Sequence, residues 1–175
     1  MDEPSGIDIP LDADALLGPL SRHGVDFVII GGLAGLIHGS AYPTYDIDIA
    51  YSRESGNLER LASALGEMGV TLRGAPADLP FKPDLATLTA GANFTFETPH
   101  GNFDILGHDA GISGYEDLRR EAVSERIDGI EVKVASIDHL IAMKRAANRT
   151  KDRLMVEEYI VIADEQQRLS DREGG

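Results

Sequence analysis

Two short stretches decide the fold of this chain: VIIGG at residues 28–32 and TYDIDI at residues 44–49. The first is typical of a buried strand that ends in a glycine turn. In the second, Asp46 and Asp48 lie two residues apart in an apolar run, so in a strand both side chains point to the same face. Two carboxylates that close repel each other unless a cation lies between them, and hard divalent ions prefer oxygen ligands. The pair therefore predicts a magnesium site.

A third acid occurs in similar surroundings. Asp104 lies between Phe103 and Ile105, and an acid inside a short apolar run is costly unless it is paired or bound to a metal. We therefore expect Asp104 to join Asp46 and Asp48 in a cluster of three carboxylates, near the edge of the sheet at which the active site lies.

Each motif also has a purely structural interpretation. An Asp-x-Asp pair is common by chance and usually lies in a solvated turn, and Gly31-Gly32 can serve only a tight turn between a strand and a helix. A glycine turn followed by an acid about 20 residues later is also the dinucleotide-binding pattern, but here Ile30 occupies the position of its first glycine. The order and spacing of the motifs together favour the metal site.

Length and composition indicate an ordinary globular protein. The chain has 175 residues, 42% of them hydrophobic, which suits one domain or a core with a small appendage. The absence of cysteine excludes disulfides, thiolate metal sites and cysteine nucleophiles. No window approaches the ~18 consecutive apolar residues of a membrane span, and the acidic start of the chain is unlike a signal peptide. We expect a soluble, cytoplasmic protein with no membrane partner.

The charge is unevenly distributed. The formal net charge of −14 argues against nucleic-acid binding, because phosphates require a basic surface. However, basic side chains outnumber acidic ones within residues 118–153. That segment contains a basic cluster, interrupted only by Asp152, which can meet a triphosphate, an RNA backbone or both. The cluster consists of Lys144, Arg145, Arg149, Lys151 and Arg153.

The hydrophobic periodicity predicts an α+β fold in which a mixed sheet is flanked by helices. Helices are expected from Asp12 or Asp14 to about residue 23, over 33–38, around 58–68 with Gly69 at the end, and over 115–122. Strands are expected over 25–30, around Asp46 and Asp48, over 93–98 and 102–106, and in a hairpin over 124–134 that turns at Asp128-Gly129. Residues 73–92, which include three prolines, are expected to be mostly loop.

The last part of the chain is predicted to be helical. Ser136 caps an amphipathic helix that contains Leu140, Ile141 and Met143. A final helix is expected over about 151–167, followed by a disordered tail at 170–175. We divide the chain near residue 135 into a sheet-based core, residues 1–135, and a C-terminal helical appendage, residues 136–175.

The motifs resemble those of the nucleotidyltransferase superfamily, which includes the DNA polymerase β-like enzymes, over residues 28–106. The block at 141–152 is similar to the lysine-x-x-x-x-arginine-x-lysine-aspartate block of the AbiEii-like toxin group, which includes the MenT toxins; here it reads Lys144, Arg149, Lys151 and Asp152. The residues at 31–34, 38–39 and 44–48 also look like that group. One departure is Tyr42, where many relatives carry an arginine.

The resemblance implies a magnesium-dependent enzyme that transfers a nucleoside monophosphate from a nucleoside triphosphate to an acceptor hydroxyl, with two magnesium ions. In the toxin group the acceptor is often the 3′ end of transfer RNA, and a cognate antitoxin protein silences the enzyme. Asp46 and Asp48 would hold both ions. Asp104 would complete the ion beside the attacking hydroxyl and can accept its proton.

The remaining candidate site residues lie at the glycine turn and in the basic block. The backbone of Gly31-Gly32 and the start of the following helix would approach the phosphates, and Ser40 either donates a hydroxyl there or stabilises a turn. Lys144 either binds the triphosphate or snorkels from an apolar helix.

Two interpretations are open for Asp152: it orients Lys144 or the acceptor for catalysis, or it caps the last helix. Arg149 and Lys151 would contact the acceptor.

Two rival functions remain. One is a small-molecule adenylyltransferase that modifies aminoglycoside or lincosamide antibiotics, with which the acidic charge is compatible. The other is a non-catalytic nucleotide-binding or antitoxin-like module. The intact set of Asp46, Asp48 and Asp104 counts against the second.

Overall fold

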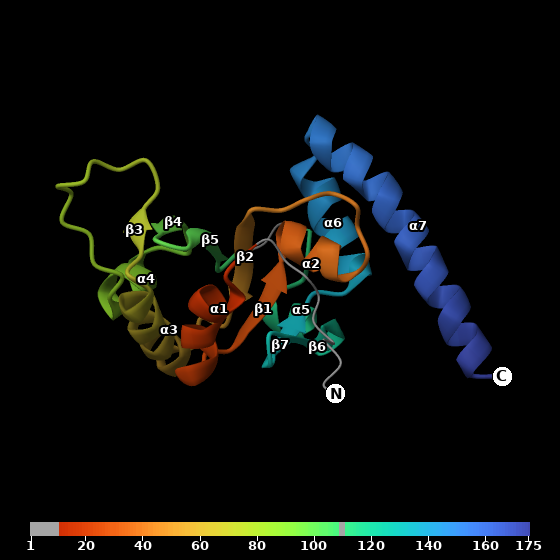
Figure 1. The fold of residues 1–175 in the computed structure, drawn as a ribbon, viewed down its shortest axis with the longest axis horizontal. Helices are drawn as coiled ribbons and strands as arrows, with labels where there is room; N and C mark the ends of the chain where they lie inside the picture. Colours follow the sequence, from red (N-terminus) through yellow and green to blue (C-terminus); the bar gives the residue numbers. More distant parts are fainter. Residues whose placement is uncertain (1–10, 109–110) are drawn as a thin grey trace.

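The computed structural model describes residues 11–108 and 111–175, so the acidic start of the chain lies outside the described residues. Its strands are β1 (Phe27–Ile30), β2 (Asp46–Tyr51), β3 (Thr71–Leu72), β4 (Asn93–Thr98), β5 (Gly101–Leu106), β6 (Val123–Ile127) and β7 (Ile130–Val134). They form one sheet in the order β3-β4-β5-β2-β1-β7-β6 (Figure 1).

The sheet is mixed, as the sequence predicts. Strand β1 pairs antiparallel with β2 and parallel with β7, and β2 pairs parallel with β5. The two expected hairpins, β4–β5 and β6–β7, are both present. The second turns at Asp128 and Gly129, which have φ angles of 49° and 82°, because a two-residue hairpin turn requires left-handed backbone. The predicted α+β fold class is confirmed.

The helices of the described part flank this sheet. They are α1 (Ala13–Arg22), α2 (Gly31–Ile37), α3 (Ser55–Met68), α4 (Leu85–Ala90), α5 (Tyr115–Glu121), α6 (Ile137–Ala147) and α7 (Thr150–Glu173). Asp12 caps α1 and Ser136 caps α6, because each side chain accepts a backbone N–H three residues later. Gly69 ends α3 in the left-handed conformation. These three expected ends are confirmed.

Residues 73–92 are mostly loop, as expected, and contain one short helix, α4, whose start is fixed by the Asp84 carboxylate accepting the N–H of Thr87. One prediction was wrong. The final helix does not stop near residue 167 but runs to Glu173, so most of the tail expected to be disordered is helical. Polar i, i+4 contacts such as that of Gln167 with Asp171, at 2.9 Å, support this last part of the helix.

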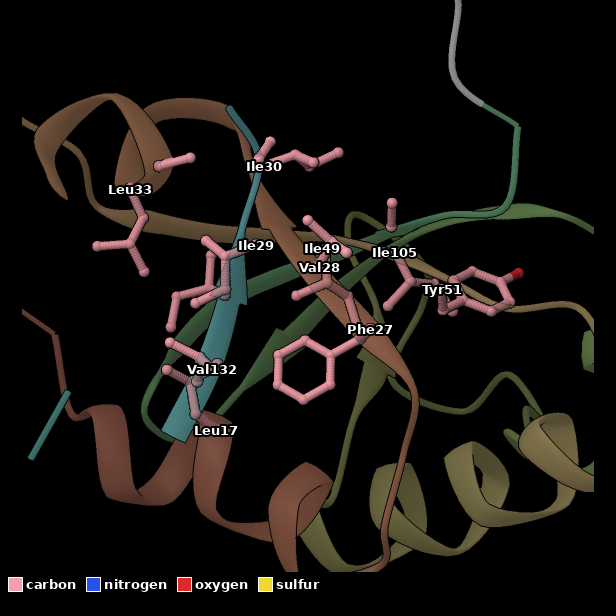
Figure 2. Close-up of a cluster of buried hydrophobic side chains, with 14 of the residues drawn as sticks. Leu17, Phe27, Val28, Ile29, Ile30, Leu33, Ile49, Tyr51, Ile105 and Val132 are labelled. Carbon is pink, nitrogen blue, oxygen red and sulfur yellow. The ribbon is translucent and has the colours of Figure 1, made fainter. Parts of the chain in front are cut away.

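The core lies between the sheet and the helices that cover it. Figure 2 shows Leu17 of α1 beneath Val132 and Phe27, and Leu33 of α2 beside β1. Strand β1 is buried along its whole length. In β2 the fully buried Ile47 and Ile49 alternate with partly exposed aspartates. This alternation directs Asp46 and Asp48 away from the core side of the sheet.

Helices α6 and α7 pack against each other beside α2, at the end of β1 where the glycine turn lies (Figure 1). Only the first half of α7 carries buried side chains, namely Met155, Val156, Tyr159 and, near the start, Asp152. Among the described residues, none of the helices combines the length and apolar character that crossing a membrane requires.

Candidate active site

Parallel pairing of β2 with β5 brings the third acid next to the first two. In this register Asp48 lies opposite Asp104, and Asp46 lies opposite Asn102. Paired residues of parallel strands point to the same face of the sheet, so the Asp48 and Asp104 carboxylates are neighbours on the face opposite the core. Asp46, two residues before Asp48, shares this face.

The glycine turn closes against the central carboxylate. Gly31 has a φ of 68°, a conformation that side chains disfavour. A Cβ atom at this position would lie 2.1 Å from Oδ2 of Asp48. The next residue, Gly32, is similarly close to Thr44, with 2.8 Å between a built Cβ and Oγ1. The double glycine therefore lets the start of α2 approach the aspartate strand directly.

Electrostatics single out Asp48 among the three acids. Burial raises its pKa, the charge of Asp104 and a hydrogen bond with Asp104 raise it further, and Asp46 adds a smaller rise. Lys144 opposes these effects, and the resulting pKa of Asp48 is about 7. A carboxyl with a strongly raised pKa beside two like charges marks a position that favours a cation.

Asp104 has an additional partner that the sequence did not indicate. Its Oδ1 accepts a hydrogen bond from Nη2 of Arg73 at 2.5 Å, and the same nitrogen donates to the Phe96 carbonyl at 3.0 Å. Arg73 directly follows the two-residue edge strand β3. It reaches Asp104 across β4, which lies between β3 and β5.

The residues present suit a hard divalent ion, although the acids are not arranged around one. In residues 11–108 and 111–175, no three His, Cys, Asp or Glu side chains are already grouped as metal ligands. The ligand types are the oxygen donors that magnesium prefers. Burial and then the repulsion from Asp104 and Asp46 raise the pKa of Asp48, and a bound cation would relieve that repulsion. The aspartates therefore fit the predicted metal, with Asp104 held by Arg73.

A cavity of about 310 Å³ opens beside Asp48. Ile30 and Asp48 line it from the sheet, Gly31 from the start of α2, and His108 from the segment after β5. Its other side is formed by helix residues, both apolar and charged: Leu140, Met143, Lys144, Ala147, Arg149 and Asp152. This size and mixed lining suit a small organic ligand with an anionic end.

Asp152 organises the charged wall of this cavity. The carboxylate is fully buried and accepts hydrogen bonds from Nζ of Lys144 at 3.2 Å and from Nε and Nη2 of Arg149 at 2.7 and 3.2 Å. It also accepts the backbone N–H of Arg149 at 3.1 Å, which caps α7. Hydrogen bonds from Arg149 are the main cause that lowers the pKa of Asp152 to about 2. Asp152 therefore both caps the helix and holds Lys144.

Ser40 and Lys151 do not line this cavity. The Ser40 hydroxyl donates a short hydrogen bond to Oε1 of Glu158, and Oε2 of Glu158 accepts the N–H of Ala41 at 2.9 Å. These contacts tie the segment before β2 to α7. Lys151 is exposed in the first turn of α7, and Arg149 is 70% exposed beyond its contact with Asp152.

Sequence reasoning missed Arg73 and His108. His108 lies four residues after Asp104 and two residues after the end of its predicted strand, so its position after that strand was an available signal. Arg73 gave no such signal, because its strand has only two residues and is fixed by pairing with β4.

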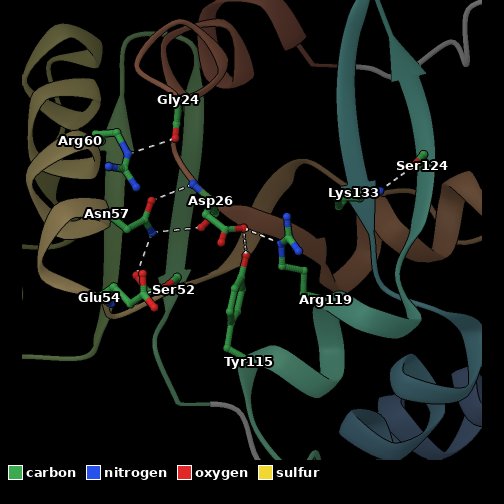
Figure 3. Close-up of polar contacts among 10 residues, drawn as sticks. All are labelled: Gly24, Asp26, Ser52, Glu54, Asn57, Arg60, Tyr115, Arg119, Ser124 and Lys133. Carbon is green, nitrogen blue, oxygen red and sulfur yellow. Dashed lines mark hydrogen bonds and ion pairs between the residues drawn. The ribbon is translucent and has the colours of Figure 1, made fainter.

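A second, larger cavity, of about 700 Å³, lies at the opposite end of β1. Its neighbourhood is organised by Asp26, whose carboxylate accepts hydrogen bonds from Tyr115 Oη at 2.7 Å and Arg119 Nε at 3.0 Å (Figure 3). Asn57 pairs with the backbone of Asp26 and with Ser52. These contacts join the start of β1 to α3 and α5, and none of the three acids lines this cavity.

Comparison with known proteins supports the fold. No family model and no curated protein matches the chain. The solution structure of the antibiotic-resistance factor ANT(2'')-Ia aligns with a TM-score of 0.51 and 16% identity, over 91% of this chain and 92% of that one. The lincomycin-bound crystal structure of the lincosamide antibiotic adenylyltransferase LnuA aligns with a TM-score of 0.55 and 12% identity, over 87% and 98%.

A crystal structure of ANT(2'')-Ia in complex with adenylyl-2''-tobramycin gives a TM-score of 0.50 and 16% identity, over 89% of this chain and 95% of that one. At these identities the similarity establishes the fold alone. This chain has the fold of nucleotidyltransferases, as its sequence predicts.

Proposed function

We propose that this protein is a magnesium-dependent nucleotidyltransferase, which moves a nucleoside monophosphate from a nucleoside triphosphate to an acceptor hydroxyl. One observation carries the proposal. The partly buried Asp48, with its pKa raised to about 7 by burial and by Asp104 and Asp46, lines a cavity that Lys144 also lines. A site that gathers negative charge beside a held cation suits a metal-bound polyphosphate.

The roles of the chain's own residues follow from their positions. Asp46, Asp48 and Asp104 would hold the metal, and Asp104 would accept the proton of the acceptor hydroxyl. Lys144, held by Asp152, meets the charge of the triphosphate. Gly31 and Gly32 lack side chains, so the backbone of the turn lies directly against Asp48 and Thr44, and we place the phosphates beside this turn. When bound, the magnesium stabilises the charge that develops on the entering and leaving oxygens.

The division of the chain into a core and an appendage fits this assignment. The core, residues 1–135, supplies the three aspartates and the glycine turn. The appendage, residues 136–175, supplies Lys144, Arg149 and Asp152 from α6 and α7. Both parts line the cavity of about 310 Å³, so we place the nucleotide between them.

For the acceptor we favour the 3′ end of transfer RNA, with the protein acting as the toxin of a toxin–antitoxin pair. The support is the basic block at 144–153: its exposed Arg149 lines the cavity that we assign to the nucleotide, and the exposed Lys151 follows two residues later in α7. An acceptor with a phosphate backbone would meet these charges. A cognate antitoxin protein is the partner this role requires.

A second candidate is an antibiotic adenylyltransferase. Its support is the structural similarity to the antibiotic-resistance factor ANT(2'')-Ia and to the lincosamide antibiotic adenylyltransferase LnuA. The net charge of −14 would suit an acceptor that carries amines. In this case Arg149 and Lys151 would not contact the acceptor.

The deciding experiment offers both acceptor classes to the full-length protein. The protein is incubated with Mg²⁺ and each α-labelled nucleoside triphosphate, together with total transfer RNA, an aminoglycoside mixture or lincomycin. Label on transfer RNA supports the toxin role, and label on a drug supports the alternative. Pyrophosphate release is measured in parallel for wild type and the Asp48→Asn variant. If wild type releases no more pyrophosphate than the variant with any of these acceptors, the proposed activity is contradicted.

A further inference from the structure

Arg73 occupies one end of a row of residues that crosses the sheet. Its backbone N–H donates to the Thr95 carbonyl at 3.0 Å, which extends the pairing of β3 with β4 by one residue. Thr95 lies opposite Asp104, Asp104 lies opposite Asp48, and Asp48 lies opposite Ile30. The guanidinium thus approaches the carboxylates from the edge of the sheet, opposite the glycine turn.

The contact of Arg73 with Asp104 is a direct ion pair in a partly shielded place. The two side chains are 28% and 18% exposed, and the nitrogen and oxygen are 2.5 Å apart. A guanidinium hydrogen-bonded to a carboxylate supplies the positive charge that a metal ion would otherwise supply. The oxygen of Asp104 that accepts this hydrogen bond cannot at the same time ligate a metal ion with full strength.

The hydrogen bonding of Arg73 is incomplete for a purely structural arginine. Its Nε is buried without a partner among the described residues. Arg53, in contrast, donates to four acceptors: the Tyr51 hydroxyl and the carbonyls of Leu88, Thr89 and Gly91. Within the described part of the chain, the Arg73 guanidinium donates only to Asp104 and to the Phe96 carbonyl. The carbonyl would keep the guanidinium in place after Asp104 turned to another cation.

We propose that Arg73 is a positioning residue that acts as the resident counter-ion of Asp104. It holds the carboxylate toward the β3 edge and competes with a divalent ion for it, so that Asp104 becomes a metal ligand only when it leaves Arg73. This inference rests on the metal site of the proposed function. It predicts that removal of the guanidinium strengthens metal binding, whereas a structural or supporting arginine would leave it unchanged or weaken it.

The test measures the binding of Mn²⁺ alone to the 175-residue protein. The electron paramagnetic resonance signal of the free ion reports how much Mn²⁺ is unbound. Arg73→Gln should bind Mn²⁺ roughly fivefold more tightly than wild type, the factor that corresponds to about 1 kcal/mol for a part-exposed ion pair. The gain should disappear in the Arg73→Gln/Asp104→Asn double variant, because the freed ligand is then absent. Arg73→Lys keeps the charge but has one contact point, so its affinity for Mn²⁺ should lie between those of wild type and Arg73→Gln.

Arg120→Gln is the matched control for net charge. Arg120 is 66% exposed on α5, where it pairs with Asp117 and Glu121. Its removal should not change the affinity for Mn²⁺. Equal gains in Arg120→Gln and Arg73→Gln would show a general charge effect and overturn the inference.

Two other outcomes separate this inference from the proposed function. If Asp48→Asn abolishes Mn²⁺ binding while Arg73→Gln and Arg73→Lys leave it unchanged or weaken it, the metal site stands and the role of Arg73 is wrong. If neither wild type nor any folded variant binds Mn²⁺, both fail. Circular dichroism establishes folding first, and if Arg73→Gln does not fold, the comparison of Arg73→Lys with wild type decides.

Discussion

The ammonium of Lys144 lies 3.2 Å from a carboxylate oxygen of Asp152, which is fully buried at the start of α7. Arg149 pairs with the same carboxylate. One acid thus joins the end of α6 to the beginning of α7 and directs the position of the cation beside Asp48. The hydrogen bonds that cap the helix and the contact that holds Lys144 are made by the same side chain.

Replacing Asp152 should therefore reduce stability in a pH-dependent way. Its pKa is lowered from 3.8 to about 2, which corresponds to roughly 2 kcal/mol of stabilisation of the folded state. We expect Asp152→Asn to lower the melting temperature at pH 7 by about 4–8 °C for a protein of this size.

The sign follows from the direction of the shift. A depressed pKa adds stability above the unfolded value and loses it as the pH falls from about 4 to 2. The difference between wild type and Asp152→Asn in urea unfolding should shrink over that range. A difference that stays constant down to pH 2 would show that Asp152 is not charged in the folded protein.

The contact between α2 and α7 predicts a large effect from a small substitution. A Cβ atom on Gly35 would lie 2.2 Å from Oη of the fully buried Tyr159. Gly35→Ala should cost about 1–3 kcal/mol, the usual cost of overpacking. Gly66→Ala, on the exposed side of α3 with nothing within 4 Å, should instead be neutral or stabilising by up to about 1 kcal/mol. Equal effects in thermal unfolding would contradict the close approach.

The Tyr159 hydroxyl offers a check on the same contact. It is buried without a partner among the described residues, and burial raises the pKa of Tyr159 to about 12. Tyr159→Phe should be neutral or stabilising, because it removes an unpaired polar group. Combined with Gly35→Ala, it should recover part of the lost stability.

Ser40 allows the two interpretations of its role to be separated. Its hydroxyl donates to Glu158, so Ser40→Ala and Glu158→Gln should each lower stability by about 1 kcal/mol and leave the affinity for nucleoside triphosphate unchanged. Calorimetric titration with a non-hydrolysable triphosphate measures that affinity. A loss of affinity in Ser40→Ala but not in Glu158→Gln would instead support direct contact with phosphate.

Different residues of the basic block should bind the nucleoside triphosphate and the acceptor. Lys144 lines the cavity, so Lys144→Ala should weaken nucleotide binding at every salt concentration. Replacement of the exposed Arg149 and Lys151 should weaken binding of transfer RNA and flatten its salt dependence, by roughly one unit of slope per lost phosphate contact. Arg149→Lys preserves the charge and should retain most of that slope. Acceptor affinity that ignores both salt and these changes would favour the antibiotic alternative.

Local sequence patterns predicted much of the fold. Alternation placed Asp46 and Asp48 on one face, Asp128-Gly129 specified a hairpin, and Ser136 marked the start of α6, because each signal acts within a few residues. The predicted end of α7 was wrong, because the sequence of a polar tail with good helix formers does not distinguish a helix from a disordered segment.

Long-range contacts account for what the sequence did not predict at the site. Arg73 meets Asp104 only because β3 joins β4 at the edge of the sheet, and Ser40 meets Glu158 only because α7 returns to the segment before β2. Neither pairing has a periodic or motif signature. For Asp152 the sequence left two interpretations open, a helix cap and a partner of Lys144. The structure shows both contacts at once.

Nucleotide transfer at Asp48 is tested most directly by comparing wild type with Asp48→Asn in the same assay of label incorporation and in thermal unfolding. Loss of metal ligation should reduce turnover at least ~100-fold. Because the pKa of Asp48 is raised to about 7, its charged form destabilises the metal-free fold as the pH rises from about 4 to above 7, so the variant should melt at an equal or higher temperature at pH 8. Asp46→Asn should lose activity in the same way, and Asp78→Asn, in the exposed loop after β3, should not. Turnover near that of wild type in folded Asp48→Asn would contradict the assignment of this site.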